Sequence, residues 1–279
     1  MDIQDPAIQR FIDNVIAEDV GSGDITSMAV IGDEAYFHGV MTARENMVVA
    51  GLPIALEIFR RLAPTAHLEA IASEGDYVQA GTVLARLDGP ARGLLTAERT
   101  ALNVLQHLSG IATLTRVYVD RIKGTGAILL DTRKTVPGLR VLAKYATRLG
   151  GARNHRLRLD CGVLIKDNHI AVCGGIKEAV ARAQAAGLAP IEVEVDTLEQ
   201  VAEAVEAGAE RLLLDNMDLE TLRLAVKIVA GHVHTEASGN VKLENLREIA
   251  ETGVDCISVG RITQSAAAID IGLDWSISG

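Results

Sequence analysis

IEVEVDTLEQVAEAVEAGAERLLLD, residues 191–215, contains a short apolar run, an amphipathic segment with helical spacing, and a second apolar run. The runs 191–195 and 211–215 have the length of buried strands, and Gly208 closes the segment between them as glycine often closes a helix. Parallel strands joined by a helix form a right-handed crossover. The stretch therefore predicts one unit of a parallel α/β sheet.

The same pattern repeats between residues 127 and 260. Further apolar runs lie at 127–131, 163–167, 232–237 and 256–260, and amphipathic segments ending in glycine lie at 177–187, 198–208, 219–231 and 243–253. Repeated strand and helix units of this kind build α/β barrels, but these are slightly few for eight strands. We therefore expect an α/β fold with a partial TIM-like barrel over residues 108–265.

The first 107 residues have a mixed pattern that predicts a separate domain. Helices are expected at 6–18 and 53–62, strands at 35–43 and 48–50, paired strands around glycine turns within 71–89, and a further helix at 98–115, which runs past the boundary. The apolar share of 48% is large enough for a sizeable core, and the low aromatic share of 3% with 26 glycines is typical of α/β proteins.

The charge distribution indicates a small anionic ligand. The net charge is −10, which argues against a nucleic-acid binder. Residues 131–170 nevertheless contain nine Lys and Arg against three acidic residues, a local charge of +6. A basic segment within an acidic protein favours a focused pocket for a small polyanion.

The cellular location and the cysteines allow two further expectations. The charged start MDIQDPAIQRF is unlike a secretory peptide, and no run approaches the roughly 18 apolar residues of a membrane span, so we expect a cytoplasmic protein with no membrane partner. The cysteines, Cys161, Cys173 and Cys256, are odd in number and lack paired spacing. We therefore expect neither a disulfide framework nor a zinc site, but small buried side chains.

Polar residues cluster where the predicted strands of the barrel end. They are Asp131, Arg133, Lys134, Lys166, Glu194, Asp215, Glu236, Ser238 and Gly260. In TIM-type barrels the loops after the strands converge on one rim, and that rim carries the active site. We expect these residues to share it.

The basic residues of this rim are suited to an anion. Arg133 can fork onto a carboxylate or phosphate while Lys134 supplies a point charge. His155 and Arg156 lie in the same basic stretch and are interpreted as ligand contacts. An alternative for Arg133 and Lys134 is that they are solvated loop charges.

The remaining rim residues suggest a phosphorylated sugar. Glu194 and Asp215 would repel a polyanion unless they met a metal ion, sugar hydroxyls or a growing positive charge. Alternatively, they neutralise the basic cluster through ion pairs. Ser238, Gly239 and Gly260 lie in the last two loops, which in such barrels commonly bind phosphate.

Motifs along nearly the whole chain resemble the quinolinate phosphoribosyltransferase family. They are, in order, GDITS (23–27), TARENMVVAG (42–51), ERTALN (98–103), DTRKTVPGLR (131–140), NHRLRLD (154–160), IKDNHI (165–170), EVEVDTLEQ (192–200), LLLDNM (212–217) and EASGNV (236–241). The resemblance implies an N-terminal α/β sandwich domain, on which 266–279 packs back, and a partial barrel. It also implies a homodimer with shared active sites and conversion of quinolinate and phosphoribosyl pyrophosphate to nicotinate mononucleotide, pyrophosphate and CO₂ with Mg²⁺.

The resemblance also implies a role for each site residue. It implies that Arg99 enters the site of the neighbouring subunit. It implies that the carboxylates of quinolinate are held by Arg133, Lys134, His155 and Arg156, and that the pyrophosphate is faced by Lys134 and Lys166. It further implies that the ribose hydroxyls and Mg²⁺ are faced by Glu194 and Asp215, and that the 5′-phosphate is bound by Ser238, Gly239 and Gly260. Lys134, Lys166, Glu194 and Asp215 form the implied catalytic set. The chain departs from the family pattern at Asn240, Arg261 and Gln264, near the phosphate subsite.

Three other functions compete with this interpretation. A sister enzyme could use another pyridine such as nicotinate, or belong to the molybdenum-associated homologues. A carrier module is suggested by EGDYVQAGTVLARLDG (74–89), but such modules need an attachment lysine and residues 1–107 contain none. A binding or scaffold protein would need no basic pocket for carboxylates.

Overall fold

The computed structural model describes residues 1–275, which form two compact units. Unit 1 comprises Met1–Leu114, Arg148–Gly150 and the segment from Ala266 onward, and unit 2 comprises Thr115–Thr147 and Gly151–Ser265. The long helix α4 (Ala91–Arg121) belongs to unit 1 as far as Leu114. Residues 276–279, the end of the segment expected to pack back on the first domain, lie outside the described residues.

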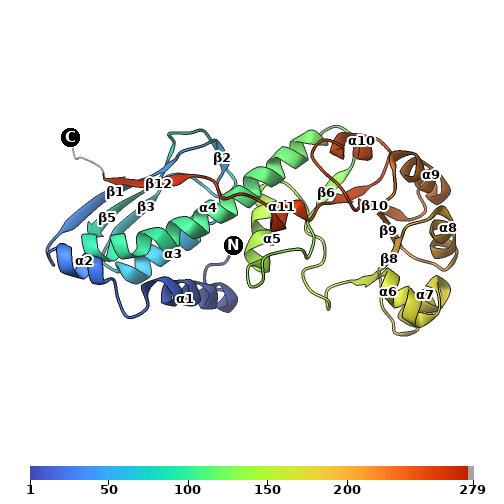
Figure 1. Cartoon of the computed structure of the whole chain (residues 1–279), viewed down its shortest axis with the longest axis horizontal. Helices are drawn as coiled ribbons and strands as arrows, with labels where there is room; N and C mark the ends of the chain where they lie inside the picture. The colour runs from blue at the N-terminus through green and yellow to red at the C-terminus, as the bar shows by residue number, and fades with distance from the viewer. Residues whose placement is uncertain (276–279) are drawn as a thin grey trace. The chain divides into compact units, whose positions relative to one another are not determined.

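Unit 1 is built on an antiparallel sheet in the order β12-β1-β5-β3. These strands are Ile271–Trp275, Tyr36–Ala43, Val83–Pro90 and His67–Ala70. A separate pair joins β2 (Met47–Val48) to β4 (Tyr77–Val78). Figure 1 shows the helices α1 (Pro6–Val20), α3 (Leu52–Leu62) and α4 on one side of the four-stranded sheet, with α2 (Ile25–Val30) at its end.

The core of unit 1 follows from the period of its elements. Along β1, buried side chains alternate with more exposed ones, and Met41 and Ala43 are fully buried. Helix α3 buries Ile54, Ile58 and Phe59 at helical spacing. The strands within residues 71–89 do not pair with each other as expected: β4 pairs with β2, and β5 pairs with β1 and β3. The backbone N–H groups of Ile71 and Ala72, just after β3, also donate to the Leu84 carbonyl of β5.

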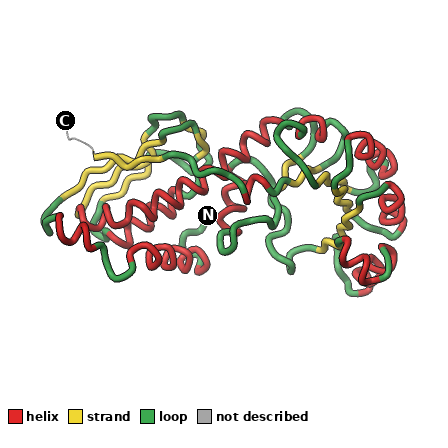
Figure 2. Tube along the Cα trace, in the orientation of Figure 1, coloured by secondary structure: helices red, strands yellow, loops and turns green. Residues whose placement is uncertain are grey.

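Unit 2 contains a six-stranded sheet in the order β6-β11-β10-β9-β8-β7, with parallel neighbours throughout. The strands are β6 (Ile128–Leu130), β7 (Val163–Ile165), β8 (Ile191–Val195), β9 (Arg211–Asp215), β10 (His234–Ser238) and β11 (Cys256–Ser258). The helices are α5 (Arg140–Leu149), α6 (Asp167–Cys173), α7 (Ile176–Ala185), α8 (Leu198–Glu206), α9 (Leu219–Val229), α10 (Leu246–Ala250) and α11 (Arg261–Gln264). Figure 2 shows the strands of unit 2 as an arc with helices α6 to α10 outside it.

The predicted α/β fold class is confirmed. Each apolar run predicted as a strand of unit 2 overlaps one of the six strands, β8 and β9 have the predicted bounds, and β10 extends one residue past the predicted run 232–237. The differences lie at helix ends: α4 begins at Ala91 rather than at residue 98, and α10 covers only five residues of 243–253.

Two further expectations concern the cysteines and membrane-spanning helices. The cysteines are free, but the expectation that they are buried is wrong: Cys161, in the loop before β7, is exposed, and Cys173 and Cys256 are partly exposed. Across residues 1–275, no helix combines the length and the apolar character needed to cross a membrane.

The strand register positions the functional residues. Ser238 lies opposite Asp215 at the ends of β10 and β9. Because alternate residues of a strand share a face, Glu192 and Glu194 project to the same side of β8, and Glu236 and Ser238 to the same side of β10. The carboxyl ends of the strands therefore form a polar rim, and Glu192 and Glu236 lie one pleat below it.

Candidate active site

A cavity of about 670 Å³ lies within unit 2. Its lining includes Arg153, His155, Arg156, Glu192, Arg211 and Glu236. His155 and Arg156 were predicted from the sequence as site residues, whereas Glu192 was not. The signal for Glu192 was its spacing, because a period of two places it on the face that carries Glu194.

Asp131 anchors the loop that carries the basic side chains. It is completely buried, and its carboxylate pairs with Lys144, which is 2% exposed. The same carboxylate accepts hydrogen bonds from Thr147 Oγ1 at 2.9 Å, Asn154 Nδ2 at 2.5 Å and the backbone N–H of His155 at 2.9 Å. Lys144 Nζ also donates to the carbonyl of His155 at 2.9 Å. Strand β6, helix α5 and the loop 153–162 are thus joined at one buried ion pair.

The expectation that Asp131 lies on the polar rim is wrong. Burial lowers the pKa of Lys144, and the hydrogen bond that Lys144 donates to Asp131 opposes this effect. A buried lysine that keeps its charge needs such a partner. Asp131 therefore positions the site without facing a ligand.

Arg133 and Arg156 form a cationic pair that the charge of Glu192 compensates only in part. Burial and the charge of Arg133 together lower the pKa of Arg156. The Arg156 guanidinium donates to the carbonyl of Gly162 at 3.0 Å, and Arg133 Nε is buried without a hydrogen-bond partner. Two guanidinium groups that repel each other and retain an unused donor are suited to a carboxylate-bearing ligand.

Lys166 and Glu194 form an ion pair at the carboxyl ends of β7 and β8. Glu194 is 14% exposed and Lys166 is 44% exposed, so the pair faces outward from the rim. The alternative in which acidic residues neutralise the basic cluster therefore applies to Glu194 in this arrangement.

Gly239 is required by a network around Asp215. The Asp215 carboxylate accepts from Asn216 Nδ2 at 2.6 Å, and Asn216 Oδ1 accepts from Asn240 Nδ2 at 2.9 Å. A Cβ atom on Gly239 would lie 2.2 Å from Asn216 Oδ1, and Gly239 has a φ of +84°. Only glycine fits there without displacing Asn216.

Gly260 and Thr263 position Lys134. A Cβ atom on Gly260 would lie 2.8 Å from Lys134 Cδ, and Thr263 Oγ1 donates to the Lys134 carbonyl at 2.7 Å. The backbone N–H of Lys134 donates to Thr132 Oγ1 at 3.0 Å. The segment after β6 is thus held against the start of α11, and the Lys134 side chain remains exposed.

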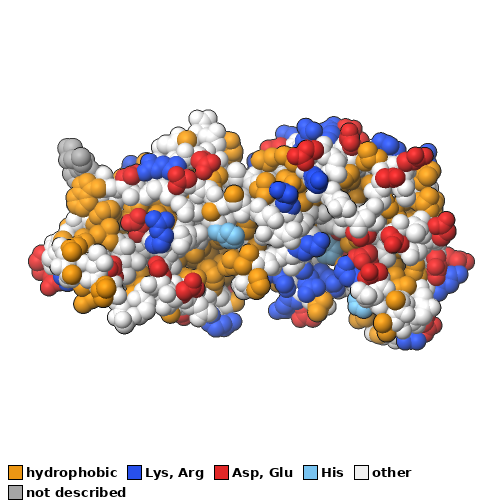
Figure 3. Space-filling model, viewed as in Figure 1, with side chains coloured by type: hydrophobic (Ala, Val, Ile, Leu, Met, Phe, Trp, Pro, Cys, Tyr) orange, Lys and Arg blue, Asp and Glu red, His pale blue; other side chains and the backbone are white. Residues whose placement is uncertain are grey.

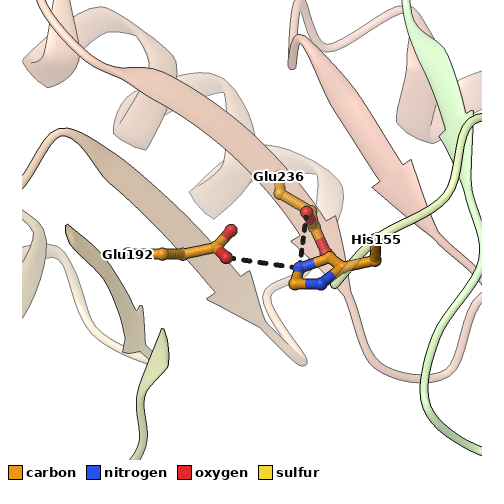
Figure 4. Close-up of side chains that lie close together, drawn as sticks. All are labelled: His155, Glu192 and Glu236. Atoms are coloured by element: carbon orange, nitrogen blue, oxygen red, sulfur yellow. Dashed lines mark ion pairs between the residues drawn. The ribbon is translucent and has the colours of Figure 1, made fainter. Parts of the chain in front are cut away.

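Below the rim, His155 faces two buried glutamates (Figure 4). His155 Nε2 lies 3.2 Å from Glu192 Oε2 and 3.5 Å from Glu236 Oε2. Glu236 was expected on the rim, which is wrong, because it lies in the middle of β10 and is 5% exposed. Burial and the charge of Glu192 raise the pKa of Glu236 to about 7.

Charge is unevenly distributed over unit 2. Figure 3 shows Lys and Arg side chains (blue) grouped in one region of this unit, with acidic side chains (red) to their right. Arg99 lies elsewhere, exposed on α4 in unit 1. Lys144 of the predicted basic segment is buried, so the segment does not lie wholly on the surface, and Arg99 belongs to the other unit.

Sequence comparisons match both units to one family. The quinolinate phosphoribosyl transferase N-terminal domain matches residues 24–109, and its C-terminal domain matches 111–274. A probable nicotinate-nucleotide pyrophosphorylase [carboxylating] of Bacillus subtilis is 42% identical, covering 97% of this chain and 94% of the relative. Another protein of that name from Synechocystis is 47% identical, covering 92% and 87%.

Structural comparisons agree. The crystal structure of nicotinate-nucleotide pyrophosphorylase from Ehrlichia chaffeensis has a TM-score of 0.94 and 41% identity, covering 99% of this chain and 100% of that one. Human nicotinic acid phosphoribosyltransferase, at 15% identity and a TM-score of 0.61, covers 94% of this chain and 73% of that one, and shares the fold alone.

Replacing Asp131 by Asn should destabilise the protein by about 3 kcal/mol, because it leaves the buried Lys144 charge without its counterion. Urea unfolding measures this change. Asp160→Asn is the matched control: Asp160 is exposed and pairs with exposed Arg158, so its midpoint should not move measurably. Equal midpoints for both variants would contradict the anchoring role of Asp131.

Glu236 should make stability depend on pH. Its folded-state pKa is raised from the usual 4.5 to about 7, so the folded state binds this proton more tightly than the unfolded state. The free energy of unfolding therefore falls as pH rises from about 4.5 to 7, by roughly 2 kcal/mol between pH 5 and 8. Glu236→Gln removes this contribution. Urea unfolding of the unaltered protein and of the variant at pH 5 and pH 8 tests it. If the free energy of unfolding changed by the same amount in both proteins, the raised pKa of Glu236 would be refuted.

Proposed function

The chain belongs to the quinolinate phosphoribosyl transferase family, and we propose that it converts quinolinate and phosphoribosyl pyrophosphate to nicotinate mononucleotide, pyrophosphate and CO₂. The observation that carries this proposal is the pair of Arg133 and Arg156, two guanidinium groups that repel each other: Arg156 lines the cavity, and Arg133 keeps an unused buried donor. Quinolinate has two adjacent carboxylates, which match two guanidinium groups better than the single carboxylate of nicotinate does.

The chemistry has two stages. The pyridine nitrogen attacks C1 of the ribose and the C1–O bond to pyrophosphate breaks, which leaves the ring nitrogen cationic. The bond between C2 of the ring and its carboxylate then breaks, CO₂ leaves, and the electron pair remains at C2 beside the cationic nitrogen until C2 takes a proton. The ring itself stabilises the electron pair, so we propose that Mg²⁺ is the one cofactor used.

Lys134 and Lys166 are placed to bind pyrophosphate. Both follow strand ends of unit 2, and the ion pair with Glu194 holds Lys166. Because charged groups aimed in advance at a leaving anion stabilise the transition state, these lysines favour departure of pyrophosphate. His155, which lines the cavity, completes the proposed contacts of quinolinate with Arg133 and Arg156.

Glu194 and Asp215 are the proposed holders of Mg²⁺ and of the ribose hydroxyls. They end adjacent parallel strands, and carboxylate oxygens are the ligands that Mg²⁺ prefers, so the donor set fits the ion. When bound, Mg²⁺ would offset the negative charge of the pyrophosphate. The two carboxylates also stabilise positive charge on the ribose as the bond to pyrophosphate lengthens.

The 5′-phosphate is proposed to bind at Ser238, Gly239 and Gly260. Ser238 ends β10, and neither glycine has room for a side chain, because Asn216 packs against Gly239 and Lys134 packs against Gly260. Asn240, Arg261 and Gln264 adjoin this subsite; Asn240 holds Asn216, and Arg261 could add a phosphate contact.

A homodimer is proposed on the resemblance that assigns Arg99 to the neighbouring active site. Arg99 is exposed on α4, as that role requires. We also propose that the enzyme acts in the cytoplasm.

Product analysis tests the reaction. The purified protein is incubated with Mg²⁺ and phosphoribosyl pyrophosphate and with either quinolinate or nicotinate, and mononucleotide and CO₂ are measured together. We expect equal amounts of both products from quinolinate. Mononucleotide from nicotinate without CO₂ would instead identify a sister transferase, and no product from either would indicate a binding protein.

Arg156→Ala should raise the KM for quinolinate by roughly 10- to 100-fold, the effect of losing a charge-assisted hydrogen bond, and change the KM for phosphoribosyl pyrophosphate much less. Arg158→Ala is the control, since Arg158 is 65% exposed and pairs with Asp160. Steady-state kinetics with each substrate varied separately checks the prediction; equal effects on both KM values would remove Arg156 from the quinolinate subsite.

A further inference from the structure

The cluster of His155, Glu192 and Glu236 has no role in the reaction described above beyond the contact assigned to His155. The two glutamates come from β8 and β10 and are each 5% exposed, and His155 comes from the loop 153–162 (Figure 4). Two carboxylates buried in an anion-binding pocket weaken its attraction for anions and are costly to desolvate. Their presence therefore requires a function.

The hydrogen bonds of His155 fix which ring nitrogen carries the proton. Nδ1 accepts the backbone N–H of Arg156 at 2.8 Å. A ring nitrogen that accepts a hydrogen bond carries no proton, so the neutral ring has its proton on Nε2. Nε2 hydrogen-bonds to Glu192 at 3.2 Å and lies 3.5 Å from the carboxylate of Glu236. The ring is thus a rigid link between the sheet and the backbone of Arg156.

A metal ion is a second possible occupant of this cluster, because one ligand atom from each of the three residues lies within 4.8 Å of the others. A metal bound at Nε2 would use the lone pair of Nε2, and the proton would then lie on Nδ1. That proton would point at the Arg156 N–H, so two donors would face each other. The hydrogen bond to Nδ1 therefore favours the glutamates, not a metal ion, as the partners of Nε2.

Arg156 depends on this link for its orientation. The loop 153–162 is anchored by Asp131 at the backbone of His155, whereas the next peptide unit is held by the His155 ring. The Arg156 guanidinium reaches the cavity and the carbonyl of Gly162. A ring that turned would release the Arg156 N–H and move the base of its side chain.

We propose that Glu192 and Glu236 are positioning residues for the pyridine dicarboxylate: they hold Nε2–H of His155, and His155 holds Arg156 in its binding orientation. The proposal rests on the proposed function. The glutamates also repel carboxylates from the inner wall of the cavity, which directs the two carboxylates of the substrate toward Arg133 and Arg156.

Steady-state kinetics of Glu192→Gln and Glu236→Gln gives the first test. Each should raise the KM for quinolinate by about tenfold while kcat and the KM for phosphoribosyl pyrophosphate change by less than about twofold. Glu178→Gln is the matched control, because Glu178 is an exposed residue of α7 that pairs with Arg182. Equal effects on both KM values would overturn the proposal.

A double-mutant cycle tests whether the glutamates act through His155. In a His155→Ala background, Glu236→Gln should cause no further rise in the KM for quinolinate, because the link is already broken. A further rise of about tenfold would show that Glu236 acts independently of His155 and would overturn the proposal. Absence of product from the unaltered protein with quinolinate would contradict the proposed function instead.

Nitrogen NMR of histidine-labelled protein reports the ring directly and needs no activity. The His155 resonances, identified by their loss in His155→Ala, should show a protonated Nε2 and an unprotonated Nδ1, before and after quinolinate is added. The Glu192→Leu, Glu236→Leu double variant, which removes both acceptors of the Nε2 proton, should lose this pattern. The opposite tautomer in the unaltered protein would overturn the proposal even if the variants failed to fold.

Discussion

The site depends on one buried ion pair, that of Asp131 with Lys144. Both residues are withdrawn from water, and the Asp131 carboxylate is also bound by Thr147, Asn154 and the backbone of His155. A loop without regular secondary structure is thereby attached to a strand and a helix at several points. Removing either charge would leave the other unpaired in the core, so a single substitution of either residue would be strongly destabilising.

The site contains two pairs of side chains with like charge. Arg133 and Arg156 repel each other, and Glu192 and Glu236 are crowded against each other below them. Each pair would be more stable with one member neutral. Proteins commonly keep such local strain where a ligand relieves it, and here the ligand would bring negative charge to the arginines.

Periodicity in the sequence predicted most of the fold. The strands of unit 2 were predicted because buried parallel strands are short apolar runs between amphipathic helices, as in 191–215. Pairing within residues 71–89 was misjudged, because glycine turns indicate where strands end and not which strand they join. The course of α4 past both predicted ends reflects tertiary packing, which local signals do not encode.

The sequence predicted site residues better at the ends of strands than within the strands. Lys166, Glu194 and Asp215 follow from strand boundaries. Asp131 and Glu236 also lie at or near strand ends, yet both are buried, because polar character alone does not separate a group that faces solvent from one that binds another buried group. Glu192 was not predicted, because it lies inside an apolar strand and not at the end of the strand, where site residues were expected.

The order of strands has a consequence for biosynthesis. The first strand of unit 2, β6, pairs with its last, β11, and β1 of unit 1 pairs with β12 near the end of the chain. At about 5–20 residues per second, β1 waits on the order of tens of seconds on the ribosome for that partner. During this interval its edge is open to pairing with other chains. A chain interrupted before β12 leaves β1 with an unpaired edge, which strands of other chains can join.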